Sequence, residues 1–315
     1  CVRGRDNLGN PPEWPATCQS VYVNTVDFQA VALEITQGIQ DWNNSVDLVA
    51  GKRTFARFHV RSTTGDLGPV SAELRAYRDG KLIGVVLIPA NNPGGTITVK
   101  KNPDRDVLED TFYFDLPSQG GYGSSWSWLW GTVHFEAKVN QNGWAETDYN
   151  NNTASVWVEF PYVPIIKVVL VDVFYDMNNT TYHVSNAQRQ ELASWLKRIY
   201  PIPGLEVSWA WMGSYNATWH LDANSNPVMD WPDCMQVNED LTWHKAHNSF
   251  GANLDKWTRY YGMVSNDGAF MRGCAVDIPA TVASGPVWDG NAWYGSHELG
   301  HTYNQSHTLG KVPGC

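Results

Sequence analysis

The sequence GSHELGHTYNQSH, at residues 295–307, decides how we interpret the second half of this 315-residue chain. It contains the pattern H-E-x-x-H, and a helix would present His297 and His301 on the same face. That separation suits two ligands of one tetrahedral Zn²⁺ ion. Glu298 is adjacent in sequence and cannot join them as a ligand on that face. Its carboxylate can instead reach a water in the open coordination position and act as its general base.

A third histidine, His307, follows His301 by six residues and cannot reach the same ion from one straight helix. The chain has to stop and turn back, and Asn304 permits this because asparagine tolerates the left-handed conformation that ends a helix. The alternative, a surface helix with incidental histidines, is disfavoured because a correctly placed third histidine is rare by chance. We therefore predict a Zn²⁺ site with His297, His301 and His307 as ligands.

The same stretch resembles the metzincin signature H-E-x-x-H-x-x-G-x-x-H, with Asn304 in the glycine position. The resemblance implies that the three histidines bind zinc and that Glu298 is the catalytic glutamate of a metallopeptidase. Metzincins also carry a methionine-containing turn after the third histidine, and Thr308–Cys315 contain no methionine. Whether the chain continues beyond Cys315, and whether this chain alone is active, therefore stay open.

Composition excludes several classes of protein. The chain is 43% hydrophobic and 17% charged, as a globular protein is, and its net charge of -10 without a basic run argues against nucleic-acid binding. The longest apolar stretch, Ile165–Tyr175, is interrupted by Lys167 and Asp172 and is too short to span a membrane. No signal peptide is visible, so the chain is a mature form or an intracellular protein.

The five cysteines favour the exported form. They are widely spaced without a C-x-x-C pattern, which indicates disulfides in a secreted or cell-surface protein rather than a zinc–thiolate site. We predict Cys1–Cys18 and Cys234–Cys274 bridges, which leaves Cys315 for a partner chain or a removed segment. A lipid-modified Cys1 is the alternative for the first residue.

The first half reads as short strands separated by turns, after an irregular arm at residues 1–20. Val70–Tyr77 and Lys81–Ile88 alternate apolar and polar residues around a turn at Asp79-Gly80. Similar runs occur at 30–36, 53–61, 133–139 and 156–160, and together they predict an antiparallel Ig-like β-sandwich over residues 21–162. With the Asn-rich segment Asp148–Thr153, this half resembles the CARDB-type Ig-like modules of bacterial surface proteins. Trp126, Trp128 and Trp130 favour packing over sugar binding.

The second half, residues 163–315, mixes strands and helices. Ile165–Val173 is predicted to be a central buried strand, and Ser185 with Gln188 forms a capping box for a helix that ends before Pro201. Further strands are predicted at 206–212 and 260–264. This order resembles the upper subdomain of zincins. The predicted fold class is therefore an all-β Ig-like sandwich followed by an α+β zincin-type catalytic domain whose lower subdomain is missing.

Gly273–Ile278 is the predicted edge strand above the metal. In metzincins such a strand binds an extended substrate through main-chain hydrogen bonds, so Gly273, Cys274, Ala275 and Val276 are the predicted substrate-binding residues. Pro279 suits an edge position because proline cannot continue a central strand. The alternative is an ordinary connecting strand.

Two other polar clusters are weaker candidates. Asp222–Asn226 has the D-x-N-x-N pattern that opens a calcium loop, so Ca²⁺ is a second candidate ion, but Pro227 stands where such a loop needs glycine and favours a surface turn. His244 and His247 lie in a polar region without a third partner in register and are interpreted as solvated.

The predicted function is that of an extracellular zinc-dependent endopeptidase. Its substrate is a protein or peptide, because an edge strand recognises backbone. The alternatives are a structural or adhesive surface or filament subunit that retains a zincin fold, and glycan binding through exposed tryptophans. A purely structural zinc site has no need of a general base, so Glu298 favours the enzyme.

Overall fold

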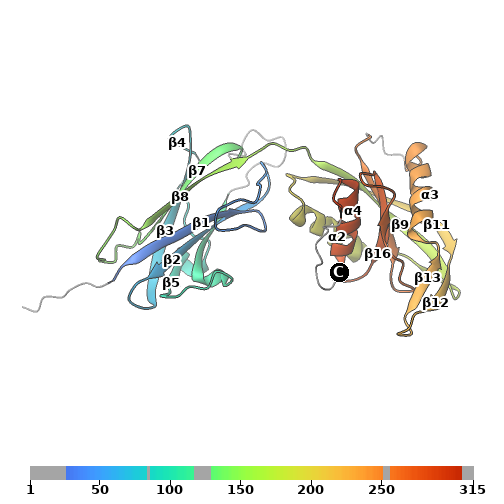
Figure 1. Ribbon diagram of the computed structural model, residues 1–315, viewed down its shortest axis with the longest axis horizontal. Coiled ribbons are helices and arrows are strands. Elements are labelled where there is room, and N and C mark those ends of the chain that lie inside the picture. The colour runs from blue at the N-terminus through green and yellow to red at the C-terminus, as the bar shows by residue number, and fades with distance from the viewer. Residues whose placement is uncertain (1–25, 84–85, 117–128, 251–255, 307–315) are drawn as a thin grey trace, which may run out of the picture. The chain divides into compact units, whose positions relative to one another are not determined.

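The computed structural model describes residues 26–83, 86–116, 129–250 and 256–306 (Figure 1). The chain divides into two compact units. The first comprises the described residues up to Ile35 together with Phe55–Leu116 and His134–Val158, and the second comprises the remaining described residues.

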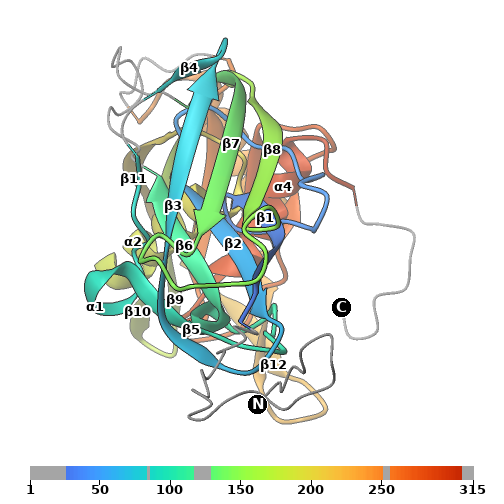
Figure 2. The ribbon, with the colours of Figure 1, turned by 90° about the vertical axis from the view of Figure 1, so that its left-hand side faces the viewer.

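The first unit contains two sheets. One has the order β1 (Phe28–Thr36), β2 (Thr54–Ser62), β6 (Thr111–Leu116). The other has the order β4 (Lys81–Leu82), β3 (Leu67–Arg78), β7 (Gly131–Val139), β8 (Thr153–Phe160), with β5 (Thr96–Val99) also pairing with β3. Figure 2 shows β3, β7 and β8 side by side. Two short helical segments, α1 (Asn92–Gly95) and η1 (Leu108–Asp110), connect strands.

Alternation along the strands builds the core of this unit. On β3 and β7 the side chains of Leu74, Ala76, Phe135 and Ala137 are buried, while their sequence neighbours face outward. The predicted turn between β3 and β4 is confirmed: Asp79 and Gly80 both have positive φ, 49° and 73°, as a two-residue hairpin turn requires.

The second unit is built on a largely parallel sheet. Strand β9 (Ile166–Met177) pairs in parallel with β11 (Leu205–Asn216) on one side and with β14 (Arg259–Ser265) on the other. Next come β16 (Val282–Val287), parallel to β14, and β15 (Cys274–Ala275), antiparallel to β16 at the sheet edge. The short β10 (Thr180–Tyr182) pairs with the end of β9. The prediction of a central buried strand at 165–173 is confirmed by β9.

Helices cover both faces of this sheet (Figure 1). Residues of α2 (Asn186–Ile199) and α4 (Ala292–Thr302) share a core with Val168 and Leu170 of β9. Residues of α3 (Cys234–Ala246) share a second core with Val169 and Val171. Successive β9 residues thus serve opposite faces, which explains why the run is apolar throughout. The predicted capping box of α2 is confirmed, with both Ser185–Gln188 hydrogen bonds present.

The predicted fold class is wrong. The described residues are 43% strand and 17% helix, their strands form several sheets, and an α+β zincin catalytic domain is not indicated. An α+β domain segregates helices from an antiparallel sheet, whereas here the strands around α2 and α3 pair in parallel. The sequence also hid the hairpin of β12 (Thr218–Leu221) and β13 (Pro227–Trp231), because β12 is exposed on both faces and has no apolar period.

Candidate active site

Helix α4 packs close to the sheet because the residues on its contact face are small. A Cβ at Gly295 would lie 3.0 Å from Leu192 Cδ1 and 3.1 Å from Tyr261 Cε1, so a larger residue would push the helix away. The Tyr200 hydroxyl also donates to the Ser296 carbonyl at 2.6 Å. These contacts fix the rotation of the helix and therefore which of its side chains are buried.

The two described histidines of the motif converge. The ring centroids of His297 and His301 lie 4.8 Å apart with an interplanar angle of 81°. His301 is buried, and its Nδ1 lies 2.6 Å from the Gln305 carbonyl oxygen, which can only accept. A proton on Nδ1 leaves the lone pair on Nε2, and a metal-binding histidine is held in this way in many zinc proteins.

The chain turn after α4 is as the sequence predicts. Asn304 has φ of 67°, in the left-handed region. Its N–H donates to the His301 carbonyl at 3.1 Å, and the Gln305 N–H donates to the Gly300 carbonyl at 3.2 Å. This hydrogen-bond pair is a Schellman motif, which ends the helix and redirects the chain. His307, the predicted third ligand, lies outside the described residues.

Glu298 faces the sheet and is 5% exposed. Burial raises the pKa of its carboxyl group, while the charges of His301 and Arg272 oppose that rise. A Cβ at Gly273 would lie 2.9 Å from Glu298 Oε1 and 2.7 Å from Tyr294 Cε1. The carboxylate therefore packs on bare backbone at the start of the edge strand, and only glycine leaves room for it.

The edge strand is short and anchored. Cys274 pairs with Ser284 and Ala275 with Ala283, and the Val276 N–H adds one further bond to the Val282 carbonyl at 3.1 Å. The predicted Cys234–Cys274 disulfide is confirmed and joins this strand to the first residue of α3. Cys1, Cys18 and Cys315 lie outside the described residues. The substrate-binding role of Gly273, Cys274, Ala275 and Val276 stays a prediction.

The weaker candidates hold other partners. The Asp222 carboxylate accepts hydrogen bonds from the N–H groups of Asn224 and Asn226, both at 2.8 Å, and these bonds lower its pKa and close the β12–β13 turn. The prediction that His244 and His247 are solvated holds for His247, which is exposed, whereas His244 is partly buried, and each ring also stacks on an aromatic side chain. His244 lies 4.8 Å from Phe250, and His247 lies 4.3 Å from Trp243.

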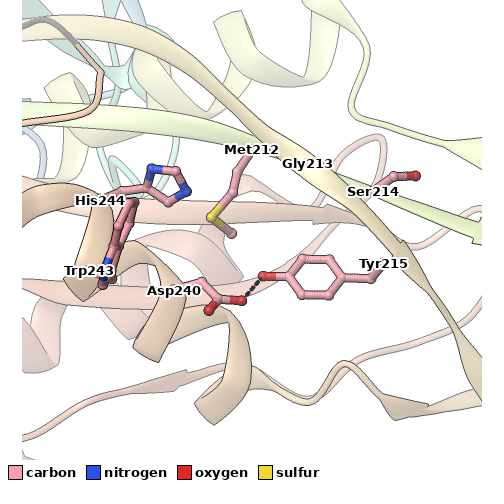
Figure 3. Close-up of a pocket in the computed structure, with 7 residues that line it drawn as sticks. All are labelled: Met212, Gly213, Ser214, Tyr215, Asp240, Trp243 and His244. Atoms are coloured by element: carbon pink, nitrogen blue, oxygen red, sulfur yellow. Dashed lines mark hydrogen bonds between the residues drawn. The ribbon is translucent and has the colours of Figure 1, made fainter. Parts of the chain in front are cut away.

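Two cavities gave no local signal in the sequence, and only the larger one includes a residue of the motif stretch, Tyr303. One, of about 270 Å³, lies between β11 and α3, where the Tyr215 hydroxyl donates to the Asp240 carboxylate (Figure 3). The other, of about 640 Å³, is lined by residues from the starts of β9 and β14 and by Tyr303. Their lining residues are far apart in sequence, so only the fold brings them together.

Comparisons with known proteins give little family information. No protein-family model matches the chain, and no curated protein matches it. A CARDB domain from Pyrococcus furiosus, solved in complex with di-metal ions, is similar at 19% identity and a TM-score of 0.26, covering 45% of this chain and 100% of that one. None of the helices in the described ranges is long and apolar enough to cross a membrane.

Proposed function

We propose that this protein is an exported, zinc-dependent endopeptidase in which Glu298 is the general base. The single observation that carries the proposal is the arrangement on α4. Two imidazoles converge within 4.8 Å, and the carboxylate between them in sequence is buried against the start of the edge strand. This arrangement adds to the resemblance of residues 297–307 to the metzincin signature.

The donor chemistry at the site fits zinc. Imidazole nitrogen is a preferred ligand of Zn²⁺, and the hydrogen bond from His301 Nδ1 to Gln305 presents Nε2 as the ligating atom. Among the residues that the structure describes, no three His, Cys, Asp or Glu side chains form a group that could hold a metal, and His307 is not among them. Zn²⁺ bound there would polarise the scissile carbonyl and lower the pKa of a coordinated water.

Glu298 would accept the proton of the attacking water and deliver it to the leaving amine. Its burial suits this role, because a carboxylate with a raised pKa is a stronger base than one in water. The close packing of Glu298 on Gly273 would hold the carboxylate in place, and the Gly273 N–H donates to the Tyr294 hydroxyl at 3.3 Å rather than to the carboxylate, so it does not lower the basicity of Glu298.

The substrate would be an extended peptide. An antiparallel edge strand offers backbone groups to a further strand, and β15 lies at the sheet edge beside Glu298. Recognition of backbone suits a protein or peptide rather than a small metabolite. The disulfide at Cys274 and the absence of a basic run fit an extracellular setting without nucleic acid.

The test is Glu298→Gln, which preserves size and removes the base. With the full chain and any natural extension beyond Cys315, zinc content and thermal stability should stay near those of the wild type, while cleavage of an unstructured protein substrate should fall by about a hundredfold or more. If the wild type cleaves nothing and the variant matches it in every assay, the enzyme proposal fails. A structural role for the site would then stand.

A further inference from the structure

The larger cavity, of about 640 Å³, opens where three parallel strands of the second unit begin. Its wall includes apolar residues 164–166 at the start of β9, the indole of Trp257, and the polar side chains of Arg259 and Tyr303. Arg259 is the first residue of β14, and Tyr303 is the C-cap residue of α4. No part of the proposed peptidase chemistry uses this cavity.

Arg259 is a buried cation, and no acidic side chain in the described ranges pairs with it. The residue is 8% exposed. Within the described chain its guanidinium donates one hydrogen bond, from Nη1 to the Trp257 carbonyl at 2.7 Å, and lies 4.6 Å from the centroid of the Tyr303 ring. Its buried Nε has no hydrogen-bond partner. Burying a guanidinium costs free energy unless a negative charge or hydrogen-bond acceptors compensate it. The Arg259 side chain is therefore suited to bind an anion.

A second donor lies beside it. The Tyr303 hydroxyl is also buried, and it has no hydrogen-bond partner in the part of the chain that the structure describes. Its ring contacts both Arg259 and the ring of Tyr200, whose centroid is 5.8 Å away. Arg259 and Tyr303 come from separate elements and line one cavity, and each has a buried donor that lacks an acceptor among the described residues, which favours an acceptor at this place.

Charge and surface define the ligand further. Lys167 Nζ lies 3.9 Å from a Glu206 carboxylate oxygen, so these two lining charges offset each other and Arg259 supplies the remaining positive charge. A monoanion suits this balance better than a doubly charged phosphate. Trp257 is 68% exposed although it is a large aromatic side chain, and with residues 164–166 it offers an apolar surface.

We propose that this cavity binds an organic carboxylate with an apolar body. The Nε–Nη2 edge of the Arg259 guanidinium matches the two oxygens of a carboxylate, and the Tyr303 hydroxyl donates to one of them. The apolar body lies on Trp257. Two sources share this chemistry: a small free acid, and the C-terminal carboxylate of a peptide.

The test uses the full chain and matched probes, read by calorimetry. N-acetylphenylalanine carries the carboxylate, and N-acetylphenylalaninamide has the same body without the charge. The acid should bind at least about tenfold more tightly than the amide, the scale of one charge-assisted hydrogen-bond pair. 3-Phenylpropanoate reports on the source: tighter binding than N-acetylphenylalanine assigns a free acid, and weaker binding assigns a peptide C-terminus. Equal binding of acid and amide, or no binding of either acid, overturns the proposal.

Variants locate the site. Tyr303→Phe removes only the hydroxyl and should weaken binding of the preferred acid about three- to tenfold while leaving the amide unchanged. Arg259→Gln should abolish the difference between acid and amide. Arg198→Gln is the matched control, because Arg198 also lies over an aromatic ring, at 5.0 Å from the Trp195 centroid, but does not line the cavity. If Arg259→Gln does not fold, an unchanged affinity in Tyr303→Phe is sufficient to reject the site.

Discussion

Helices α3 and α4 lie on opposite faces of one sheet and end in the same way, yet their histidines behave differently. Each helix is followed by an asparagine with positive φ, Asn248 at 49° and Asn304 at 67°. At α3 the Asn248 N–H donates to the Lys245 carbonyl and the Ser249 N–H to the His244 carbonyl, which repeats the Schellman motif of α4. The end of the helix alone therefore does not make a site.

The difference lies in spacing and neighbours. His297 and His301 are four residues apart, and their rings approach each other. His244 and His247 are three residues apart, and their rings stack on different aromatic side chains. His244 stacks on Phe250, and His247 stacks on Trp243. In α4 the buried neighbour Glu298 meets the backbone of Gly273, whereas α3 meets the same strand through the Cys234–Cys274 disulfide. Helix α4 thus places the Glu298 carboxylate against the start of the edge strand, and α3 anchors that strand through the disulfide.

Removal of one histidine from each helix gives the largest expected contrast. His301→Ala should reduce zinc affinity about a thousandfold, because roughly 10–16 kcal/mol of binding free energy is shared among a few ligands. His247→Ala should leave zinc affinity within about twofold, since its ring stacks on Trp243 instead. Competition with a chromophoric chelator measures both. An equal loss of zinc affinity in the two variants would mean that the metal binds elsewhere.

The disulfide tests whether α3 supports the edge strand. It closes a loop of 40 residues in sequence separation. The paired change Cys234→Ala with Cys274→Ala should lower the free energy of unfolding by about 3 kcal/mol, mainly by freeing the unfolded chain. Urea denaturation followed by circular dichroism measures this. Proteolysis near Ala275 should rise as well, and an unchanged cleavage pattern would mean that the strand is held without the bridge.

Local signals were predictable from sequence because their physics is local. The capping box at Ser185, the Asp79-Gly80 turn and the left-handed Asn304 each depend on a few adjacent residues. The fold class was not, because the parallel pairing of β9 with β11 and β14 depends on residues far apart in the chain. The cavity donors Arg259 and Tyr303 likewise belong to different elements, and each alone resembles an ordinary polar residue.

Gly273 tests the contact between the edge strand and Glu298. Gly273→Ala places a Cβ 2.9 Å from Glu298 Oε1 and 2.7 Å from Tyr294 Cε1, so the strand or the helix has to shift. We expect a loss of about 2 kcal/mol in the free energy of unfolding, typical of overpacking. Gly213→Ala is the control, because a Cβ there meets nothing within 4 Å. Thermal unfolding measures the stability of both variants. Equal stabilities would show that Gly273 and Glu298 are not closely packed.

The smallest effect returns to the shared helix ends. Glycine adopts positive φ without the steric cost that asparagine bears, so Asn304→Gly and Asn248→Gly should each raise the free energy of unfolding by up to about 1 kcal/mol. Alanine tolerates this conformation less well, and Asn304→Ala and Asn248→Ala should each lower the free energy of unfolding by about 1 kcal/mol.

The two positions should differ in their effect on zinc affinity. Asn304 directs the chain from His301 towards His307, so Asn304→Ala should weaken zinc binding several-fold, while Asn248→Ala should leave it unchanged because no predicted ligand follows α3. Chemical denaturation and the same chelator competition measure the two quantities on the same four proteins. If all four variants bind zinc equally, the turn at Asn304 serves only to end the helix, as its counterpart at Asn248 does.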